Sequence, residues 1–426
     1  MKNLWNDVDA KTFKDDLALR VYTSRLLGQD STLVLHGGGN TSVKITETNI
    51  VGEQEEILYV KGSGWDLVSI EKAGFSPVRM AHMIKLGKLD SLSDPQMVNE
   101  LKTQLTNASA PAPSVETILH AILPFKYVDH THADAVVTIS NTSNGEERIR
   151  EIYGDRVVIV PYVMPGFDLS KDVGRLFSEQ ATDKTEGMVL LNHGIFSFGD
   201  NAKQAYDRMI NLVDLAEKYL INQNAWELEK PLGGLSTKPM RNEIAQLRQS
   251  ISAVITSPVL FNLTNSERGI DFSNQDDVTS IATRGPVTPD HVIRTKRIPM
   301  IGCDVNQYIE EYASYFDTHE PNAKQRKTML DAAPRVILDQ EFGLCAVGKN
   351  MGEIGIIADL YEHTMQCILR AEELGGWQAL PAADIFDLEY WDLEQAKLQK
   401  GGNAPEFQGE VVLITGAASG IGKACI

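Results

Sequence analysis

Two segments rich in glycine and proline interrupt the globular pattern of this chain of 426 residues and limit how it can fold. The first contains PLGG at residues 231–234, and the second is KGGNAPEFQGE at residues 400–410. Such segments usually connect compact domains rather than enter a core. We therefore expect separate parts at residues 1–228, 239–398 and 409–426, with a linker at residues 399–408.

Apolar residues in the first part follow two different spacings. They recur at helical spacing over residues 15–27, 114–123 and 202–220. Short runs that are typical of strands occur at residues 31–35, 40–45, 56–60, 135–140, 157–160 and 188–192. The alternation of the two patterns predicts a mixed α/β domain.

The second part contains a segment that resembles one in the first. Residues 335–348 (RVILDQEFGLCAVG) and residues 187–199 (GMVLLNHGIFSFG) both show an apolar strand, a turn, a short apolar run and a glycine before a long helix. We expect a second α/β region here, and one hypothesis makes it a degenerate repeat that has lost its chemistry, because Phe342 stands where the first copy has His193. The alternative is that such strand–turn–strand–helix units simply look alike.

The composition restricts the possible partners. Against 40 Lys and Arg residues stand 58 Asp and Glu residues, which gives a net charge of −18. A chain this acidic repels phosphate backbones and anionic membrane surfaces. The four cysteines form no CxxC pair, and no stretch is apolar enough to span a membrane. We therefore expect a cytoplasmic protein that binds neither nucleic acid nor membranes.

Three histidines form the strongest candidate site. His130 and His132 flank one threonine, and residues i and i+2 of an extended segment point to the same face. His193 follows a later apolar run, at a turn before a glycine. Three imidazoles that leave one position open are the pattern of a catalytic zinc site. An HxH pair taken alone is more often an ordinary surface or core pair, so the motif by itself leaves both interpretations open.

A glutamate and two glycine-rich loops are further candidates. Glu116 stands near the start of the helix expected at residues 114–123, where it either complements the helix dipole or serves as a general acid or base beside a metal. Residues 36–42 (HGGGNTS) and 61–64 (KGSG) could hold a phosphate through backbone N–H groups. Either loop alone is typical of an ordinary turn.

These motifs occur in the order GNTS, KGSG, PSVE, HTH and NHG. In that order they resemble the class II aldolase/adducin family over about residues 15–220. The resemblance implies an α/β/α sandwich with a mixed or antiparallel central sheet. It also implies that His130, His132 and His193 hold Zn²⁺ or another divalent metal, and that Glu116 is the catalytic acid/base.

The resemblance further implies a phosphate pocket. Its lining residues would be Asn40, Ser42, Lys61, Ser63, Gly64 and Ser114. One departure from the family's pattern falls in this pocket, because phosphate-binding members commonly have Ser-Ser-Glu where this chain has Ser114-Val115-Glu116. A hydroxyl is lost, so an unphosphorylated substrate is an alternative.

The last residues carry a different motif. An apolar strand is expected at residues 411–414, followed by TGAASGIG, in which Gly416, Gly420 and Gly422 would let the backbone approach a pyrophosphate. This resembles the cofactor loop of short-chain dehydrogenases. The motif is too short for a Rossmann domain, so we expect a truncated start of one, a fragment of a longer two-enzyme polypeptide, and NAD chemistry only in that longer form.

Together the motifs resemble the aldolase part of bifunctional rhamnulose-1-phosphate aldolase/lactaldehyde dehydrogenases. The resemblance implies retro-aldol cleavage of a ketose 1-phosphate, with L-rhamnulose 1-phosphate giving dihydroxyacetone phosphate and L-lactaldehyde. It also implies a homotetramer or other cyclic oligomer, in which a neighbouring subunit supplies the group that deprotonates the leaving hydroxyl. The alternatives are a sugar-phosphate 4-epimerase or decarboxylase with the same histidines, and a non-catalytic adducin-like binding module.

Overall fold

The computed structural model describes residues 1–230, 241–264, 266–398 and 405–426. The chain divides into two compact units that are not simply consecutive in sequence. The first unit consists of Met1–Lys230, Ile281–Ile293 and His363–Leu398, and the second holds the remaining described residues. Residues 231–238, and residues 399–404 of the linker expected at residues 399–408, lie outside the described residues, and the domain boundaries drawn from these segments stay a prediction.

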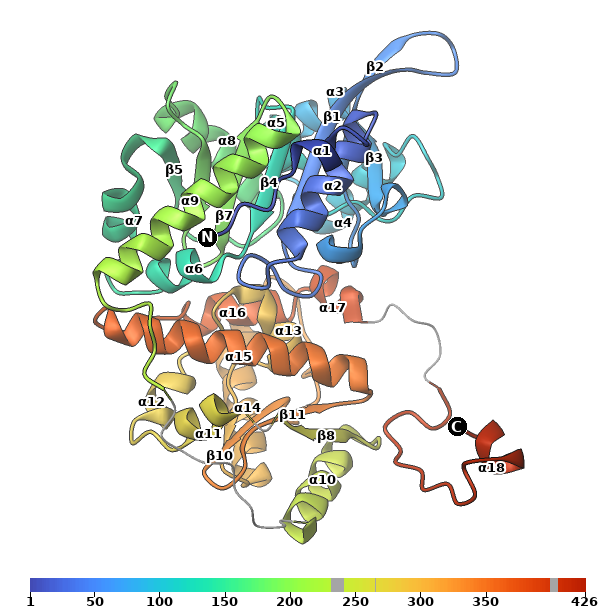
Figure 1. The fold of residues 1–426 in the computed structure, drawn as a ribbon, viewed down its shortest axis with the longest axis vertical. Helices are drawn as coiled ribbons and strands as arrows, with labels where there is room; N and C mark the ends of the chain where they lie inside the picture. The colour runs from blue at the N-terminus through green and yellow to red at the C-terminus, as the bar shows by residue number, and fades with distance from the viewer. Residues whose placement is uncertain (231–240, 265, 399–404) are drawn as a thin grey trace. The chain divides into compact units, whose positions relative to one another are not determined.

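A seven-stranded sheet forms the centre of the first unit (Figure 1), in the order β3-β2-β1-β4-β7-β6-β5. Strands β5 and β6 pair in parallel, and every other neighbouring pair in this sheet is antiparallel. This confirms the expected mixed sheet. The strands are β1 (Asn40–Thr48), β2 (Gln54–Lys61), β3 (Phe75–Arg79), β4 (Tyr127–Thr131), β5 (Val157–Val160), β6 (Gly187–Leu190) and β7 (Gly194–Gly199).

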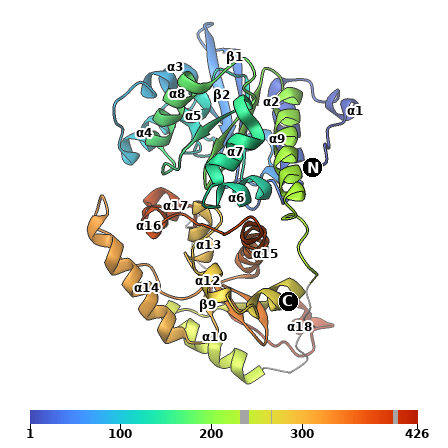
Figure 2. The same ribbon diagram turned by 90° about the vertical axis from the view of Figure 1, so that its left-hand side faces the viewer.

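Helices cover both faces of this sheet (Figure 2), which confirms the expected sandwich. Because successive side chains of a strand point to opposite faces, Val157 and Ile159 share one core while Val158 and Val160 share the other. The first face packs against α2 (Asp16–Gly28), α6 (Asp134–Ser140), α7 (Gly145–Tyr153) and α9 (Ala202–Asn222). The second packs against α3 (Met80–Leu86), α4 (Asp94–Thr103), α5 (Thr117–Ile122) and α8 (Phe167–Gln180).

Side-chain caps fix where the two long helices of the first face begin. The carboxylate of Asp15 accepts the N–H of Ala18 at the start of α2, and the side chain of Asn201 accepts the N–H of Gln204 at the start of α9. Each cap satisfies a backbone donor that has no partner within the helix. Both helices occur where the apolar spacing predicted them.

Two strands expected in the first unit are wrong. Residues 31–35 form turns instead, because the carbonyl of Asp30 accepts the N–H groups of Leu33 and Val34 while its carboxylate accepts that of Thr32. Residues 135–140 lie in helix α6. All seven residues of α6 are buried, and a short run that is buried on every side does not reveal its period from sequence.

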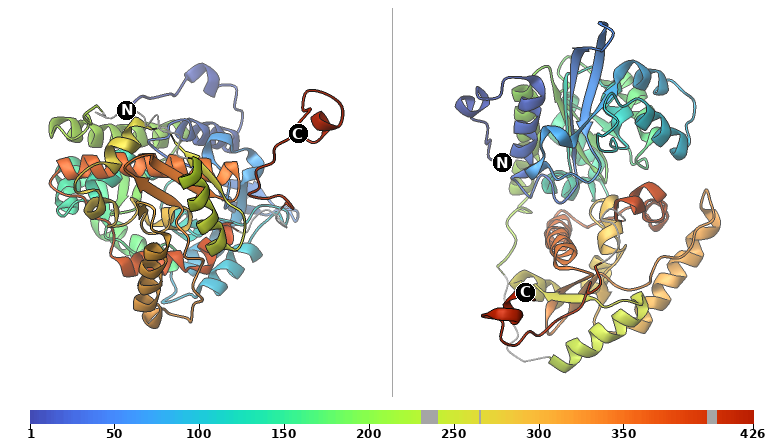
Figure 3. Two further views of the ribbon diagram at one scale, coloured as in Figure 1. Left: turned by 90° about the horizontal axis from the view of Figure 1, so that it is seen from below. Right: turned by 90° about the vertical axis from the view of Figure 1, so that its right-hand side faces the viewer.

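The second unit contains a smaller sheet in the order β8-β11-β10-β9. Its strands are β8 (Leu260–Leu263), β9 (Met300–Ile301), β10 (Val336–Asp339) and β11 (Gly343–Gly348). Helices α10 (Arg241–Ile255) and α14 (Val305–His319) share a hydrophobic core with β10 and β11, and Figure 3 shows these two helices in the second unit. Helix α15 (Met351–Glu373) follows β11, so the expected strand–turn–strand–helix unit is present. The proposed relation of this unit to β6, β7 and α9 stays a hypothesis.

The remaining helices are short. They are α1 (Asp7–Ala10), α11 (Glu267–Ser273), α12 (Val278–Ala282), α13 (Val292–Thr295), α16 (Ala382–Glu389), α17 (Asp392–Leu398), α18 (Gly420–Ala424) and the 3-10 helices η1 (Leu67–Ser69), η2 (Lys72–Gly74), η3 (Gly154–Arg156), η4 (Pro289–His291) and η5 (Glu320–Asn322). Within the described parts of the chain, no helix combines the length and apolar character that crossing a membrane requires.

The strand expected at residues 411–414 is also wrong. These residues form no regular element, and the side chains of Val411, Val412 and Leu413 are exposed. A strand needs a neighbouring strand to accept and donate its backbone hydrogen bonds. Among the described residues none pairs with this segment.

Candidate metal centre

The register of the sheet brings the three predicted histidines together. His130 lies in β4 opposite Phe196 of β7, and His132 follows directly after β4. His193 lies in the turn between β6 and β7, so it stands at the same end of the sheet. Nε2 of His130 is 3.1 Å from Nε2 of His132, and one ring nitrogen from each of the three residues lies within 4.8 Å of the others.

The turn that carries His193 leaves no space for a larger neighbour. Asn192 has a left-handed backbone (φ 59°), and its side-chain amide donates to Asn141 at 2.5 Å. A Cβ on Gly194 would collide with the carbonyl oxygen of Thr131 and lie 3.1 Å from atoms of both the His130 and His132 rings. Glycine at this position therefore allows the three imidazoles to approach one another.

Burial prepares these imidazoles as ligands. His130 is 1% exposed and His193 is 5% exposed. Burial, assisted by the neighbouring rings, lowers the pKa of His130 well below its ordinary value, and burial lowers the pKa of His132 to about 3. Neutral imidazoles present a free lone pair, which is the form that binds a metal. Three nitrogen donors with this spacing fit a divalent transition metal such as zinc.

Glu116 lies beside this cluster. It is the N-cap residue of α5, but its side chain makes no capping hydrogen bond to the helix. Its Oε2 accepts the side-chain amide of Asn40 at 3.3 Å, and its Oε1 is 3.9 Å from Nε2 of His130. Within the described part of the chain, Oε1 has no hydrogen-bond partner. Burial raises the pKa of Glu116, which favours a carboxyl that can both hold and release a proton.

Four of the six residues expected to form a phosphate pocket are Asn40, Ser114, Ser63 and Gly64, and they belong to two contacting parts of the chain. Asn40 stands opposite His130 in the sheet and donates to the hydroxyl of Ser114. A backbone bridge between Gly62 and Pro113, together with the bond from the N–H of Ser63 to the carbonyl of Ala112, holds the KGSG loop beside Ser114. Gly64 is exposed in this loop with φ 87°.

The other two residues expected in this pocket have polar partners within the protein. The ammonium of Lys61 donates to the carbonyls of Gly37 and Gly39, at 2.8 and 3.1 Å, and the residue is 5% exposed. The hydroxyl of Ser42 shares a hydrogen bond of 2.8 Å with Nδ1 of His120. Burial lowers the pKa of His120 to about 3, so this bond links two neutral groups at physiological pH.

Two residues near the site, Asp290 and Lys397, were not identified from the sequence. Oδ2 of Asp290, in η4, is 3.4 Å from Nδ1 of His132. Lys397 of α17 is close enough for its charge to act on both Glu116 and Asp290. Val115 packs against an apolar cluster formed by Val292, Leu380, Ile385, Leu388 and Trp391. No local pattern marks Asp290 or Lys397, because they become neighbours of the site only through the packing of residues 281–293 and 363–398 in the first unit.

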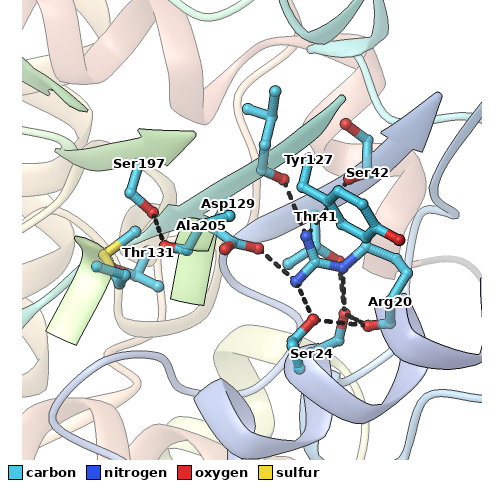
Figure 4. A network of polar contacts seen from close by, with 12 residues as sticks. Arg20, Ser24, Thr41, Ser42, Tyr127, Asp129, Thr131, Ser197 and Ala205 are labelled. Atoms are coloured by element: carbon cyan, nitrogen blue, oxygen red, sulfur yellow. Dashed lines mark hydrogen bonds and ion pairs between the residues drawn. The ribbon is translucent and has the colours of Figure 1, made fainter. Parts of the chain in front are cut away.

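A buried polar network supports β4 on the face away from His130 (Figure 4). The guanidinium of Arg20 is 2.5 Å from the carboxylate of Asp129, and both side chains are fully buried. Arg20 also donates to the hydroxyls of Thr23 and Ser24, and Ser24 shares a hydrogen bond of 2.9 Å with Thr41 of β1. The network therefore ties α2 to the two strands that carry Asn40 and His130.

The three glycines of the C-terminal motif form a compact turn. Gly416 and Gly420 have left-handed backbones (φ 65° and 56°). A Cβ on Gly422 would lie 2.5 Å from the carbonyl oxygen of Gly416. Gly420 is the first residue of α18 and Gly422 lies within this short helix, so the motif overlaps the helix start.

Comparisons with known proteins agree with the order of these motifs. Residues 18–220 match the model of the class II aldolase and adducin N-terminal domain, and residues 238–398 match the model of the class II aldolase second domain. The uncharacterized oxidoreductase YuxG of Bacillus subtilis (strain 168) is 32% identical over 451 residues, which cover 100% of this chain. This chain spans 64% of the length of that relative.

Two solved structures are similar to about half of this chain. The N-terminal class II aldolase domain of a conserved protein from Thermoplasma acidophilum is 45% identical, with a TM-score of 0.48, and the match covers 52% of this chain and 99% of that one. The L-fuculose-1-phosphate aldolase from Thermus thermophilus is 17% identical, with a TM-score of 0.31, and the match covers 49% of this chain and 96% of that one.

Proposed function

Because this chain belongs to the class II aldolase and adducin family, we propose that it is a metal-dependent aldolase that cleaves a carbon–carbon bond of a ketose phosphate. The observation that carries the proposal is the convergence of three imidazoles within 4.8 Å of one another, beside a buried glutamate. A structural metal site would not need a carboxyl with a raised pKa at its edge.

We assign the metal to His130, His132 and His193, and we propose zinc as its identity. A divalent cation held there would polarise the ketose carbonyl and favour breaking of the neighbouring carbon–carbon bond. The three protein donors leave a coordination position for the substrate.

The substrate that we propose is L-rhamnulose 1-phosphate. In the retro-aldol direction its C3–C4 bond breaks, the C4 hydroxyl passes its proton to a base, which the family resemblance assigns to a neighbouring subunit, and the C4 oxygen becomes the aldehyde of L-lactaldehyde. The bonding electron pair moves to C3, where Glu116 delivers a proton to give dihydroxyacetone phosphate. Oε1 is the oxygen that we expect to carry this proton, because Asn40 already donates to Oε2.

We propose that Asn40, Ser63, Gly64 and Ser114 contact the phosphate, with Lys397 as the nearby positive charge. A second candidate, cleavage of an unphosphorylated ketose or sugar acid, is favoured by two observations. Val115 packs in an apolar cluster, and the ammonium of Lys61 is already bonded to two backbone carbonyls. Both features reduce the capacity of this pocket for a dianion.

The C-terminal motif and the longer relative support a second step in a longer form of the protein. We propose that a dehydrogenase part, begun by Gly416, Gly420 and Gly422, binds NAD there and oxidises the aldehyde product. We also propose self-association as a homotetramer or other cyclic oligomer, to be measured by light scattering.

The test is release of dihydroxyacetone phosphate from L-rhamnulose 1-phosphate by the full chain, with and without a chelator and with zinc added back. We expect metal-dependent release that is lost in Glu116→Gln and retained in Glu147→Gln, a matched change on the exposed face of α7. Inversion at C4 without cleavage would instead indicate an epimerase. Cleavage of only an unphosphorylated ketose would favour the second candidate, and metal binding without turnover would indicate a non-catalytic module.

A further inference from the structure

Asp290 approaches the metal centre from a segment that lies beyond the N-terminal aldolase domain. It belongs to η4, inside residues 281–293. By the family model these residues are part of the second aldolase domain, but in the structure they pack within the first compact unit. Its Oδ2 is 3.4 Å from Nδ1 of His132, on the side of the imidazole away from the Nε2 that faces His130.

A buried contact three residues before Asp290 holds its segment in place. The side-chain amide of Asn141 donates to the carbonyl of Val287 at 2.9 Å and accepts the amide of Asn192, the residue before His193. Both Asn141 and Val287 are buried. One asparagine thus ties the segment of Asp290 to the turn that carries the third histidine.

A second contact ties the same domain to the end of β4. Nδ1 of His363, in α15, is 2.6 Å from Oδ2 of Asp134, which lies two residues after His132. Two residues of the second domain, Asp290 and His363, therefore contact the chain at and just after the end of β4. Asp290 is part of a built arrangement and not a single chance contact.

A metal-binding histidine needs a partner for its second ring nitrogen. A carboxylate at that nitrogen accepts its proton, fixes the tautomer and the ring orientation, and makes the other nitrogen a better ligand. Asp290 is in the right place for this role toward His132. Its side chain is 23% exposed, and within the described residues its second oxygen, Oδ1, has no hydrogen-bond partner.

We propose that Asp290 is a positioning residue of the metal centre, which accepts the Nδ1 proton of His132 and holds Nε2 toward the metal. The second domain thereby completes the centre within the same chain. This inference rests on the metal site assigned under the proposed function, but it concerns metal affinity and not the sugar that is cleaved.

The test measures affinity for zinc and for cobalt by competition with a chromogenic chelator, using the full chain and Asp290→Asn. We expect the variant to bind about 10- to 100-fold more weakly. The matched control is Asp387→Asn, which removes the same charge at an exposed position of α16 and should bind like the unchanged protein. Circular dichroism of the metal-free proteins verifies folding, and Asp290→Ser replaces Asp290→Asn if the latter fails to fold.

A double-substitution cycle with His132→Ala separates positioning from a general electrostatic effect. We expect Asp290→Asn to cause no further loss of affinity when His132 is absent. An unchanged affinity of Asp290→Asn, or an equal loss with and without His132, would overturn the inference. If the unchanged protein binds metal but cleaves no sugar, the proposed function fails while this inference is still decided by the affinities. If cleavage is metal-dependent but Asp290→Asn binds normally, the inference alone fails.

Discussion

Replacing Arg20 with methionine should destabilise the first unit by about 4 kcal/mol at pH 7. The change removes the only guanidinium that the described residues place against the fully buried carboxylate of Asp129, and methionine fills a similar volume. A buried carboxylate without a counter-charge can avoid its desolvation cost by taking up a proton. Since an ordinary aspartate titrates near pH 4, protonating it at pH 7 costs about 1.4 kcal/mol for each of about three pH units. This agrees with the 3–5 kcal/mol that is typical when one partner of a buried pair is lost.

The same reasoning fixes the pH dependence. Burial already raises the pKa of Asp129, and removal of Arg20 takes away the charge that opposes this rise. The folded variant then binds a proton that the unfolded chain releases above about pH 4, so its stability falls as the pH rises. We expect the difference in free energy of unfolding from the unchanged protein to shrink by about 1.4 kcal/mol per pH unit between pH 7 and pH 5.

Urea unfolding followed by tryptophan fluorescence provides the assay. All five tryptophans (Trp5, Trp65, Trp226, Trp377 and Trp391) belong to the first unit, so their fluorescence reports on its unfolding. Arg150→Met is the matched control, because its ion pair with Glu146 is exposed and should contribute less than about 1 kcal/mol. The double variant Arg20→Met/Asp129→Leu should recover most of the loss. A loss below about 1 kcal/mol in Arg20→Met, or a loss that does not change with pH, would refute the reasoning.

Two further predictions concern single positions in the first unit. Gly194→Ala should weaken metal binding by at least about tenfold in chelator competition, because the added methyl group displaces the rings of His130 and His132. The control Gly355→Ala, where a Cβ meets no atom within 4 Å, should leave the metal affinity unchanged. Equal metal affinities of Gly194→Ala and the unchanged protein would contradict the role given to Gly194. Lys44→Met should raise the free energy of unfolding at pH 7 by about 2 kcal/mol. Burial lowers the pKa of Lys44 to about 8 from 10.5, so the folded protein carries an unfavourable buried charge at pH 7 that the variant lacks. The unfolded chain binds the extra proton between these two pH values, so this gain should disappear as the pH rises from about 8 to 10.5, and a gain of constant size would exclude the explanation.

The gathering of the histidines could be predicted because its causes are local and periodic. Two histidines at i and i+2 share a face of any strand, and a histidine at the turn between two paired strands returns to the same end of the sheet. The register of β4 with β7 then brings His193 to His130 and His132. The strands and helices with clear spacing, such as β5 and α9, were predicted for the same reason.

The parts that could not be predicted depend on tertiary packing. Nothing in the sequence around Asp290 distinguishes it from other acidic residues, and it reaches His132 only because residues 281–293 pack within the first unit. Lys61 was expected to face an anion, but its ammonium is bonded to the carbonyls of the glycine-rich loop. The exposed segment 411–414 has the apolar pattern of a strand and pairs with no described strand.

The central claim is that one divalent metal ion, held by His130, His132 and His193, is needed for cleavage of a ketose phosphate. The most direct measurement is a titration of the metal-free chain with zinc while the release of dihydroxyacetone phosphate from L-rhamnulose 1-phosphate is recorded. The account predicts that activity rises in proportion to bound zinc, saturates at one ion per chain and is absent at every zinc concentration in His193→Ala. Activity that is already full without metal, or that His193→Ala retains, would contradict it.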